Sequence, residues 1–290
     1  TVEWLTLVAF AAEAYQQSEL AWEVRKHAQA HAFVERELEM ARQIQEGLVP
    51  KTLRFEGLDV AVGFQPCRWV GGDYVDAVPM PDGRVLLAVA DVCGKGLQAA
   101  LVASSLHTMV RVTADAGGSV HQLMDRLNNY LCNYLPEHSF VTMICMAIDP
   151  RTGEVECLNA GHPPAFIVAP DGSIHQLQSE ANIALGMLPT ELSVERSFLA
   201  EGEVICLYTD GLSDRTGVDQ EMLGTDRLAE GFSAIVKQSP LASVEDLRIR
   251  LIQMLDNYSG SQLAADDSAF LVARRPRTHR MLSSRPPRLA

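Results

Sequence analysis

The sequence predicts an α+β fold, in which antiparallel strands are covered by helices and a long helix precedes them. Three observations predict it. Neither proline nor glycine occurs before Gly47, which is typical of an uninterrupted helix. From Leu58 onward, short apolar runs alternate with turn signals, and two pairs of runs are joined by turns short enough for hairpins. Three later segments are predicted helices, two of them with helix-start signals, so helices and antiparallel strands share one layered domain.

Composition narrows the class of protein. The 290 residues are 47% apolar and 21% charged, which suits one large domain or one domain with an extension. We expect a cytoplasmic protein without a membrane span, because no apolar run approaches the ~20 residues that a span needs and no secretory signal is visible. The net charge is −13, and residues 274–290 hold six arginines and no acid, so the remainder carries −13 − 6 = −19. A domain with this negative charge would repel nucleic acid, so nucleic acid is not an expected partner.

The first element is a helix over residues 1–49, which Pro50 ends. Apolar positions recur along it at steps of three and four and form a seam: Val34, Leu38, Ala41, Ile44 or Gln45, and Leu48. Two interpretations of the seam stay open. The helix packs on its own domain, or it forms a parallel coiled coil that joins two copies or an upstream domain.

The strands follow as short apolar runs between turns. Turn signals at Asp149–Gly153 and Pro170–Gly172 predict two hairpins. The predicted strands are 58–64, 84–90, 140–148, 154–159, 165–168, 174–177, 203–209 and 268–273.

Three helices are predicted among and after these strands. Two of them begin with a capping box, in which a serine precedes an acidic or amide residue by three positions. They are the helices from about Gly96 to Thr113, from Ser119 (with Gln122) to about Leu135, and from Ser243 (with Asp246) to about Tyr258.

Four aspartates stand at the ends of predicted strands or in the loops beside them. Apolar runs lead directly into Asp91 and Asp210, Asp266 precedes the last run, and Asp73 is expected in a loop between strands. In antiparallel sheets the end of one strand lies beside the start of its neighbour, so all four can meet at one edge. Each aspartate alone could be a turn residue, but the apolar runs and the flanking glycines together favour a site.

Carboxylates gathered at one edge repel one another, so they need cations to neutralise them. Because the ligands are oxygens without a histidine or cysteine cluster, Mg²⁺ or Mn²⁺ is favoured over Zn²⁺. Two such ions would bridge a water molecule, lower its pKa and bind a phosphoryl oxygen. Two other motifs do not indicate a binding site. Gly94–Gly96 lacks the spacing of a nucleotide-binding loop, and His162 in the turn Asn159–Pro164 is expected to be structural.

Five segments occur in an order that is typical of one protein family: GGDYVD at 71–76, PDGRVLLAVADVCGKG at 81–96, LNAGHPPAFIV at 158–168, LYTDGLSD at 207–214 and ADDSAFLV at 265–272. They resemble the metal-dependent protein phosphatases of the 2C type (the PPM family), in the bacterial branch named for SpoIIE and RsbU. The lead-in ELEMARQIQEGLVP at 37–50 also resembles the helix before this domain. The resemblance covers roughly residues 35–274.

This resemblance implies an αββα sandwich of two antiparallel sheets flanked by helices, with two metal ions, Mn²⁺ or Mg²⁺, at one sheet edge. By the same likeness Asp73 and Asp91 share the two ions, and the Val92 backbone carbonyl is a further ligand. Asp210 and Asp266 complete the shell of one ion. Asp267 stands where the family has a second polar residue.

The sequence departs from the family pattern at positions that carry no metal carboxylate. Cys93 stands where a serine is common, Val75 replaces a frequent aromatic residue, and Ser268-Ala269 replaces an apolar–threonine pair. The resemblance therefore favours an active enzyme over a pseudo-phosphatase.

The implied activity is hydrolysis of phosphoserine or phosphothreonine by a metal-activated water. The expected substrate is an anti-anti-sigma (STAS-type) protein in a bacterial partner-switching pathway. The alternative is a dimeric signalling scaffold, or a pseudo-phosphatase with a weak or idle metal site. A generic two-metal phosphodiesterase is disfavoured, because the sequence has no histidine-rich metal cluster.

The apolar seam, the composition of the chain end and the resemblance together give an expected division of the chain. Residues 1–49 are expected to form a coiled-coil linker that follows an upstream sensor domain and joins two copies into a homodimer. Residues 50–274 are the expected phosphatase domain, and residues 275–290 are an expected basic, disordered tail.

Overall fold

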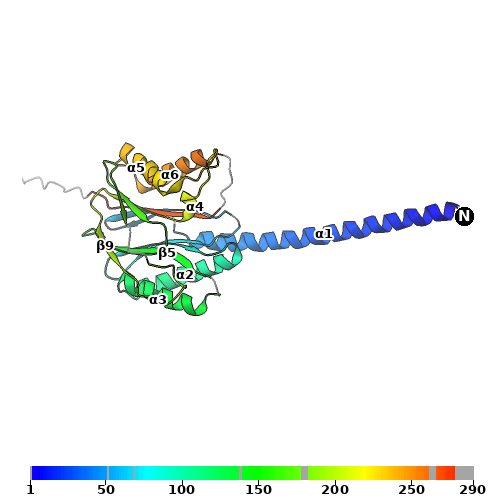
Figure 1. The fold of residues 1–290 in the computed structure, drawn as a ribbon, viewed down its shortest axis with the longest axis horizontal. Helices are drawn as coiled ribbons and strands as arrows, with labels where there is room; N and C mark the ends of the chain where they lie inside the picture. The colour runs from blue at the N-terminus through cyan, green and yellow to red at the C-terminus, as the bar shows by residue number, and fades with distance from the viewer. Residues whose placement is uncertain are drawn as a thin grey trace, which may run out of the picture. The chain divides into compact units, whose positions relative to one another are not determined.

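The structure is a computed structural model, which describes residues 2–50, 52–67, 69–136, 139–177, 182–260 and 266–277. The chain divides into two compact units, Thr1–Glu46 and Gly47–Ala290. The first unit is built from one helix, α1 (Val2–Leu48), so the predicted long N-terminal helix is confirmed (Figure 1). Among the helices that can be described, none combines the length and the apolar character needed to cross a membrane.

The second unit contains two antiparallel sheets. The first sheet has the strand order β1 (Thr52–Phe55), β2 (Leu58–Gln65), β11 (Ser268–Arg274), β10 (Val204–Tyr208), β7 (Ala165–Val168) and β8 (Ile174–Leu177). The second has the order β3 (Asp73–Pro79), β4 (Val85–Val92), β5 (Val141–Ile148), β6 (Glu154–Ala160) and β9 (Glu195–Phe198). Both predicted hairpins, β5–β6 and β7–β8, are present.

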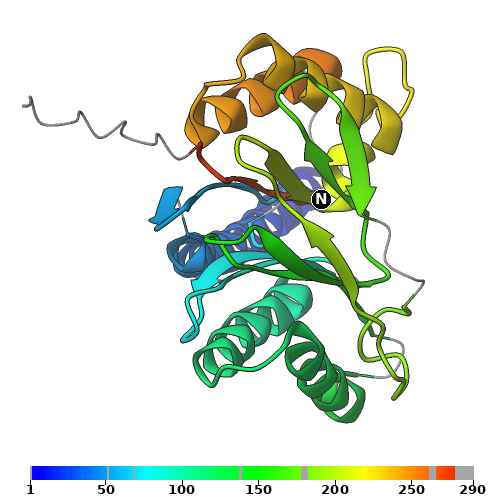
Figure 2. The ribbon, with the colours of Figure 1, turned by 90° about the vertical axis from the view of Figure 1, so that its left-hand side faces the viewer.

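Helices cover the outer face of each sheet (Figures 1 and 2). The second sheet is covered by α2 (Leu97–Asp115) and α3 (Val120–Tyr134), and the first by α5 (Gly224–Gln238) and α6 (Val244–Ser259). The short α4 (Asp210–Ser213) follows β10. Both predicted capping boxes form at the starts of α3 and α6. The αββα sandwich is therefore confirmed.

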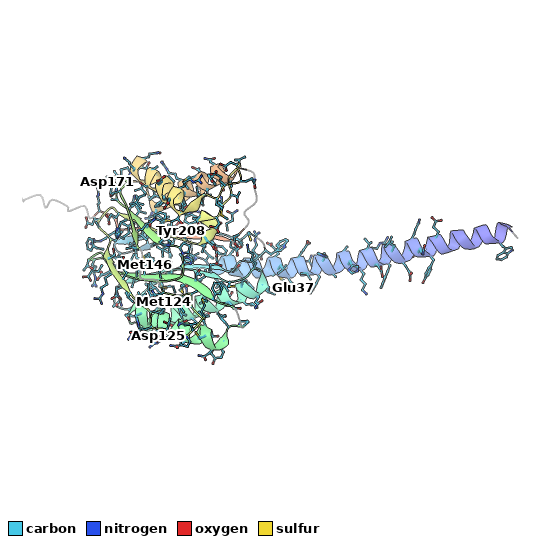
Figure 3. All side chains as sticks on the ribbon, in the orientation of Figure 1. Glu37, Met124, Asp125, Met146, Asp171 and Tyr208 are labelled. Atoms are coloured by element: carbon cyan, nitrogen blue, oxygen red, sulfur yellow. The ribbon has the colours of Figure 1, made fainter. Side chains whose placement is uncertain are left out.

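Three apolar layers hold the sandwich together. Met124, Met146 and Tyr208, labelled in Figure 3, belong to the helix side of the second sheet, the space between the sheets, and the helix side of the first sheet. Successive residues of a strand point to opposite faces. In β4, Leu86, Ala88 and Ala90 lie in the helix-side layer, whereas Val85, Leu87 and Val89 lie between the sheets. By this alternation Asp91 faces the space between the sheets.

The structure corrects the expected position of Asp73, which begins β3 and does not lie in a loop. The strand pairs with β4 along its whole length, from Asp73 opposite Asp91 to Pro79 opposite Val85. It escaped prediction because Asp76 interrupts its apolar run, although Asp76 is completely buried.

Four further elements were not predicted: β1, β9, α4 and α5. The two strands are only four residues long and half-exposed, so they lack a buried run. The N-cap residue of α5, Leu223, makes no side-chain capping hydrogen bond, so that helix has no start signal in the sequence.

Candidate metal centre

Two of the four predicted carboxylates come from neighbouring strands of the second sheet. Asp73 and Asp91 are register partners on β3 and β4, so their side chains lie on one face of the sheet. Burial, followed by the charge of Asp91, raises the pKa of Asp73 well above its usual value. Burial, followed by the charges of Asp210 and Asp266, raises the pKa of Asp91 to about 6. Both groups therefore sit where negative charge is disfavoured.

The other two carboxylates come from the first sheet. Asp210 is the first residue of α4, directly after β10, and Asp266 lies just before β11. The pKa of Asp210 is raised by burial and then by the charges of Asp214 and Asp266. Because Asp210 and Asp266 also act on the pKa of Asp91, the structure brings carboxylates from both sheets together at one edge.

A threonine that the sequence did not single out connects the two sheets at this edge. The Thr209 hydroxyl lies 2.8 Å from Oδ2 of Asp73 and donates to it. Oγ1 of Thr209 in turn accepts a hydrogen bond from the Ala269 N–H at 2.9 Å. This contact opposes the rise in the pKa of Asp73, and it fixes one carboxylate oxygen in place.

Asp267 has a different task from its neighbour Asp266. It is buried, and its oxygens accept hydrogen bonds from the backbone N–H groups of Cys67 and Gly72, both at 2.8 Å. A Cβ atom at Gly71 would lie 2.5 Å from Oδ2 of Asp267, so only glycine fits there. Asp267 therefore holds the loop that leads into Asp73, a role that sequence reasoning did not find.

The glycines beside the carboxylates allow other close approaches. A Cβ atom at Gly211 would lie 1.6 Å from the Asp267 carbonyl oxygen. A Cβ atom at Gly72 would lie 3.0 Å from the Val92 carbonyl oxygen, and the Val92 N–H donates to Gly72 O at 3.3 Å. The Val92 carbonyl, predicted as a ligand, thus lies against the segment that carries Asp73.

Two more side chains lie at this edge, and the sequence did not assign them to it. Lys95 Nζ is 2.8 Å from Oδ2 of Asp266. Possible ligand atoms of Cys67, Asp266 and Asp267 lie within 4.8 Å of one another. Burial and then Asp267 raise the pKa of the Cys67 thiol to about 11, so it is protonated at neutral pH and is a poor ligand. The donor set is thus oxygen-based, which fits Mg²⁺ or Mn²⁺.

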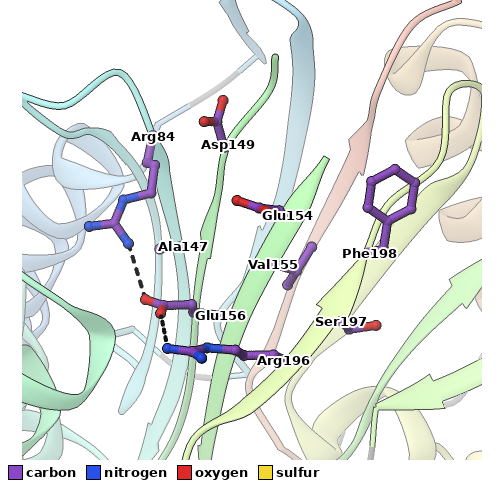
Figure 4. A pocket seen from close by; sticks show the side chains of 9 residues that line it. All are labelled: Arg84, Ala147, Asp149, Glu154, Val155, Glu156, Arg196, Ser197 and Phe198. Carbon is purple, nitrogen blue, oxygen red and sulfur yellow. Dashed lines mark hydrogen bonds and ion pairs between the residues drawn. The ribbon is translucent and has the colours of Figure 1, made fainter. Parts of the chain in front are cut away.

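A separate pocket of about 540 Å³ lies at the opposite end of the second sheet (Figure 4). There Glu156 pairs with Arg84 at 3.1 Å and with Arg196 at 3.5 Å, so its charge is neutralised within the wall. Asp91 lies at the other end of β4, so this pocket is not part of the candidate metal centre. The pocket is lined by Arg84, Ala147, Asp149, Glu154, Val155, Glu156, Arg196, Ser197 and Phe198.

Known proteins are similar to this chain in sequence and in fold. The chain is 28% identical over 271 residues to protein IcfG of Synechocystis sp., and 25% identical over 243 residues to phosphoserine phosphatase RsbP of Bacillus subtilis. Each comparison covers 82% of this chain, but the chain spans only 41% and 57% of those two proteins.

A solved structure agrees with these relatives. The structure of the RsbU and RsbW domains of Rv1364c from Mycobacterium tuberculosis has a TM-score of 0.66 and 28% identity, covering 78% of this chain and 65% of that one. Residues 81–276 match the family model described as stage II sporulation protein E (SpoIIE). The predicted resemblance is confirmed: the chain belongs to the SpoIIE family.

Proposed function

We propose that this chain is a metal-dependent protein serine/threonine phosphatase. One observation carries the proposal. Carboxylates from two sheets, Asp73 and Asp91 on one and Asp210 and Asp266 on the other, meet at a single edge, where burial and neighbouring carboxylates raise the pKa values of Asp73, Asp91 and Asp210. The names of relatives support the reaction class, since RsbP and RsbU of Bacillus subtilis are both named phosphoserine phosphatases.

In this proposal the four carboxylates hold two Mn²⁺ or Mg²⁺ ions. Asp73 and Asp91 would hold both ions, and the Val92 carbonyl, Asp210 and Asp266 would be further ligands. The ions, when bound, would supply a water of lowered pKa and a clamp for the phosphoryl oxygens. The chain itself orients the ligands: Thr209 fixes one oxygen of Asp73, and Asp267 fixes the loop before it.

The proposed substrate is a phosphoserine or phosphothreonine of a STAS-type anti-anti-sigma protein in the cytoplasm. The support comes from relatives, because one solved chain carries an RsbU domain together with an RsbW domain. The net charge of −13 disfavours nucleic acid as a partner.

The test is Mn²⁺-dependent phosphate release from a panel of phosphorylated STAS-type proteins. The wild-type chain should release phosphate from at least one of them, and Asp210→Asn should lower kcat/KM at least about 100-fold. Asp171→Asn, in a remote turn, is the matched control and should behave as wild type. An Asp210→Asn variant within a factor of two of wild type at limiting Mn²⁺ would sink the proposal.

We also propose that residues 1–49 form a coiled-coil linker that dimerises the domain over residues 50–274. In support, α1 exposes large apolar side chains along its length, among them Trp22 at 62%, Phe33 at 65% and Val34 at 53%. The expected basic tail falls mostly on residues 278–290, outside the described residues. Sedimentation should give a dimer for the whole chain and a lighter species once residues 1–34 are removed. A monomer at tens of micromolar would contradict this.

A specific observation keeps the scaffold alternative in view. Lys95 already pairs with Asp266, so an ammonium and a metal ion compete for the same carboxylate. A chain that dimerises but binds no Mn²⁺ at millimolar concentration would be a scaffold and not an enzyme.

A further inference from the structure

A lysine lies in the turn that follows β4 and leads into α2. β4 ends at Val92 and α2 begins at Leu97, so Lys95 lies between the candidate metal centre and the helix. Its neighbours Gly94 and Gly96 have φ angles of 101° and 78°, which residues with a side chain rarely adopt. The two glycines therefore set the course of the turn that carries Lys95.

The side chain of Lys95 reaches from the second sheet to the first. Its Nζ lies 2.8 Å from Oδ2 of Asp266, just before β11, although the two residues are 171 positions apart. The other oxygen of Asp266, Oδ1, accepts a hydrogen bond from the Asp267 N–H at 3.0 Å. The ammonium of Lys95 thus lies at the edge where the carboxylates of both sheets meet.

The charge of Lys95 acts on more than its direct partner. Burial and neighbouring carboxylates raise the pKa values of Asp91 and Asp210, and the charge of Lys95 offsets part of this rise. Lys95 therefore acts on candidate ligands from both sheets, and it reduces the repulsion that this edge exerts on an approaching anion.

The pair of Lys95 with Asp266 is exposed enough to open. The two side chains are 44% and 42% exposed, and ion pairs in contact with water contribute little to stability. A metal ion ligated by Asp266 would repel the ammonium from the same carboxylate. Because a lysine ammonium stands on a flexible four-carbon stem, it can turn to another anion at this edge while the backbone stays in place.

The phosphoryl group of the proposed substrate is such an anion. A phosphoserine or phosphothreonine carries a charge of about −1.5 to −2 at pH 7 and has three strong acceptor oxygens. Lysine binds phosphate as a point charge, so it needs no exact fit between two planar groups. The ammonium at the candidate metal centre therefore has the chemistry to bind the group that the enzyme would remove.

We propose that Lys95 is a substrate-binding residue: its ammonium leaves Asp266 when that carboxylate ligates a metal ion, and it then binds the phosphoryl oxygens of the substrate. Two effects follow from this exchange of partners. Lys95 competes with the metal ion for Asp266 when no substrate is present, and it strengthens substrate binding once the ions are in place. The inference rests on the proposed function, because it names a further residue of the same site.

The first test measures Mn²⁺ binding to the full chain without substrate, by electron paramagnetic resonance of free Mn²⁺. Lys95→Met removes the competing charge, so we expect it to lower the Mn²⁺ Kd about two- to fivefold, the equivalent of one exposed ion pair. Lys95→Arg keeps the charge and should bind Mn²⁺ as wild type does. Arg151→Met is the matched control, because Arg151 pairs with Asp149 beside the remote pocket, and it should leave the Kd unchanged.

The second test measures hydrolysis at saturating Mn²⁺, with p-nitrophenyl phosphate and with a phosphoprotein of the panel, and inhibition by inorganic phosphate. Lys95→Met should raise KM and the inhibition constant of phosphate about 10-fold, as loss of a hydrogen bond to a charged group does. The effect on kcat should be smaller, since the contact is made to the bound substrate as well as to the transition state. Lys95→Arg should keep most of the affinity for phosphate.

A residue that only joins the two sheets would give a different result. The inference fails if Lys95→Met does not bind Mn²⁺ more tightly than wild type, or if KM and the phosphate inhibition constant stay at their wild-type values. It also fails if Lys95→Arg binds phosphate as weakly as Lys95→Met, because the charge would then not be the cause. Wild-type protein that neither binds Mn²⁺ nor releases phosphate would overturn the proposed function itself, which is a separate result.

Discussion

Two buried aspartates of one strand differ in what surrounds them. Asp73 and Asp76 both lie on β3, and because they are three positions apart they point to opposite faces. Asp76 faces α2, where Arg111 binds it through Nε and Nη2, both at 2.8 Å, and the Ala77 N–H donates to it at 2.8 Å. Asp73 faces the space between the sheets, where the charges that act on it are those of other aspartates.

This difference separates a structural carboxylate from a candidate metal ligand. Asp76 has its counter-charge within the fold, so it binds α2 to the sheet and needs nothing from solution. Asp73 has neighbours of its own sign, and its pKa is raised well above the usual value, so an external cation would stabilise its charged form. Burial alone would not distinguish these two residues.

The largest expected effect is on activity, from Asp73→Asn. Loss of one shared carboxylate should lower kcat/KM at least about 100-fold. The melting temperature in EDTA should stay equal or rise, since the neutral side chain removes repulsion from Asp91. A fall in melting temperature with activity retained would mean that Asp73 is structural, as Asp76 is.

Arg111→Met should lower the stability of the fold and leave Mn²⁺ binding unchanged, the reverse of what Asp73→Asn does. It leaves Asp76 buried without its cation, so we expect about 3 kcal/mol of lost stability in urea unfolding, with Mn²⁺ binding retained. Arg196→Met is the control, because Arg196 is 84% exposed where it pairs with Glu156, and such pairs contribute at most about 1 kcal/mol. Equal effects of the two variants would remove the distinction between the faces of β3.

Asp267→Asn tests a third kind of buried aspartate, whose partners are backbone N–H groups. The amide can accept at only one oxygen, so either the Cys67 or the Gly72 N–H loses its acceptor. We expect a loss of about 1–3 kcal/mol in unfolding free energy, with a several-fold weaker Mn²⁺ Kd. Unchanged stability would contradict the assigned role in holding the loop.

The smallest effect is on the pH dependence of stability without metal. Asp91 has a pKa of about 6 in the fold against 3.8 in the unfolded chain. A carboxyl whose folded pKa is raised contributes stability that is full below the unfolded pKa and is lost as pH rises through the folded one. Relative to Asp91→Asn, the wild type in EDTA should therefore lose stability between about pH 4 and pH 7. A difference that stays constant over this range would contradict the raised pKa.

Most of the fold could be predicted from local signals. The capping serines Ser119 and Ser243 located two helices, and turn glycines located both hairpins. Apart from β3, four elements were missed: α5 lacks a capping side chain, and β1, β9 and α4 are too short to show a pattern. The strand β3, which carries Asp73, was not predicted because the buried Asp76 interrupts its apolar run. Arg111, which neutralises Asp76, lies 35 residues away on a helix.

The carboxylates of the candidate site could be predicted from the sequence, but the residues that hold them in place could not. Asp91 and Asp210 stand out because apolar runs lead into them, and the order of the segments implied the rest. The roles of Asp267 and Thr209 depend on contacts across 60 to 200 residues, as in Cys67 to Asp267 and Thr209 to Ala269. A sequence pattern carries no information on such distances.

The most direct test of the account is a Mn²⁺ titration of three proteins: wild type, Asp73→Asn and Arg111→Met. The account predicts that wild type and Arg111→Met bind Mn²⁺ with similar affinity while folded, whereas Asp73→Asn binds at least about 10-fold more weakly. If Asp73→Asn binds as wild type does, or if Arg111→Met loses binding equally while still folded, the carboxylate edge between the sheets is not the metal centre.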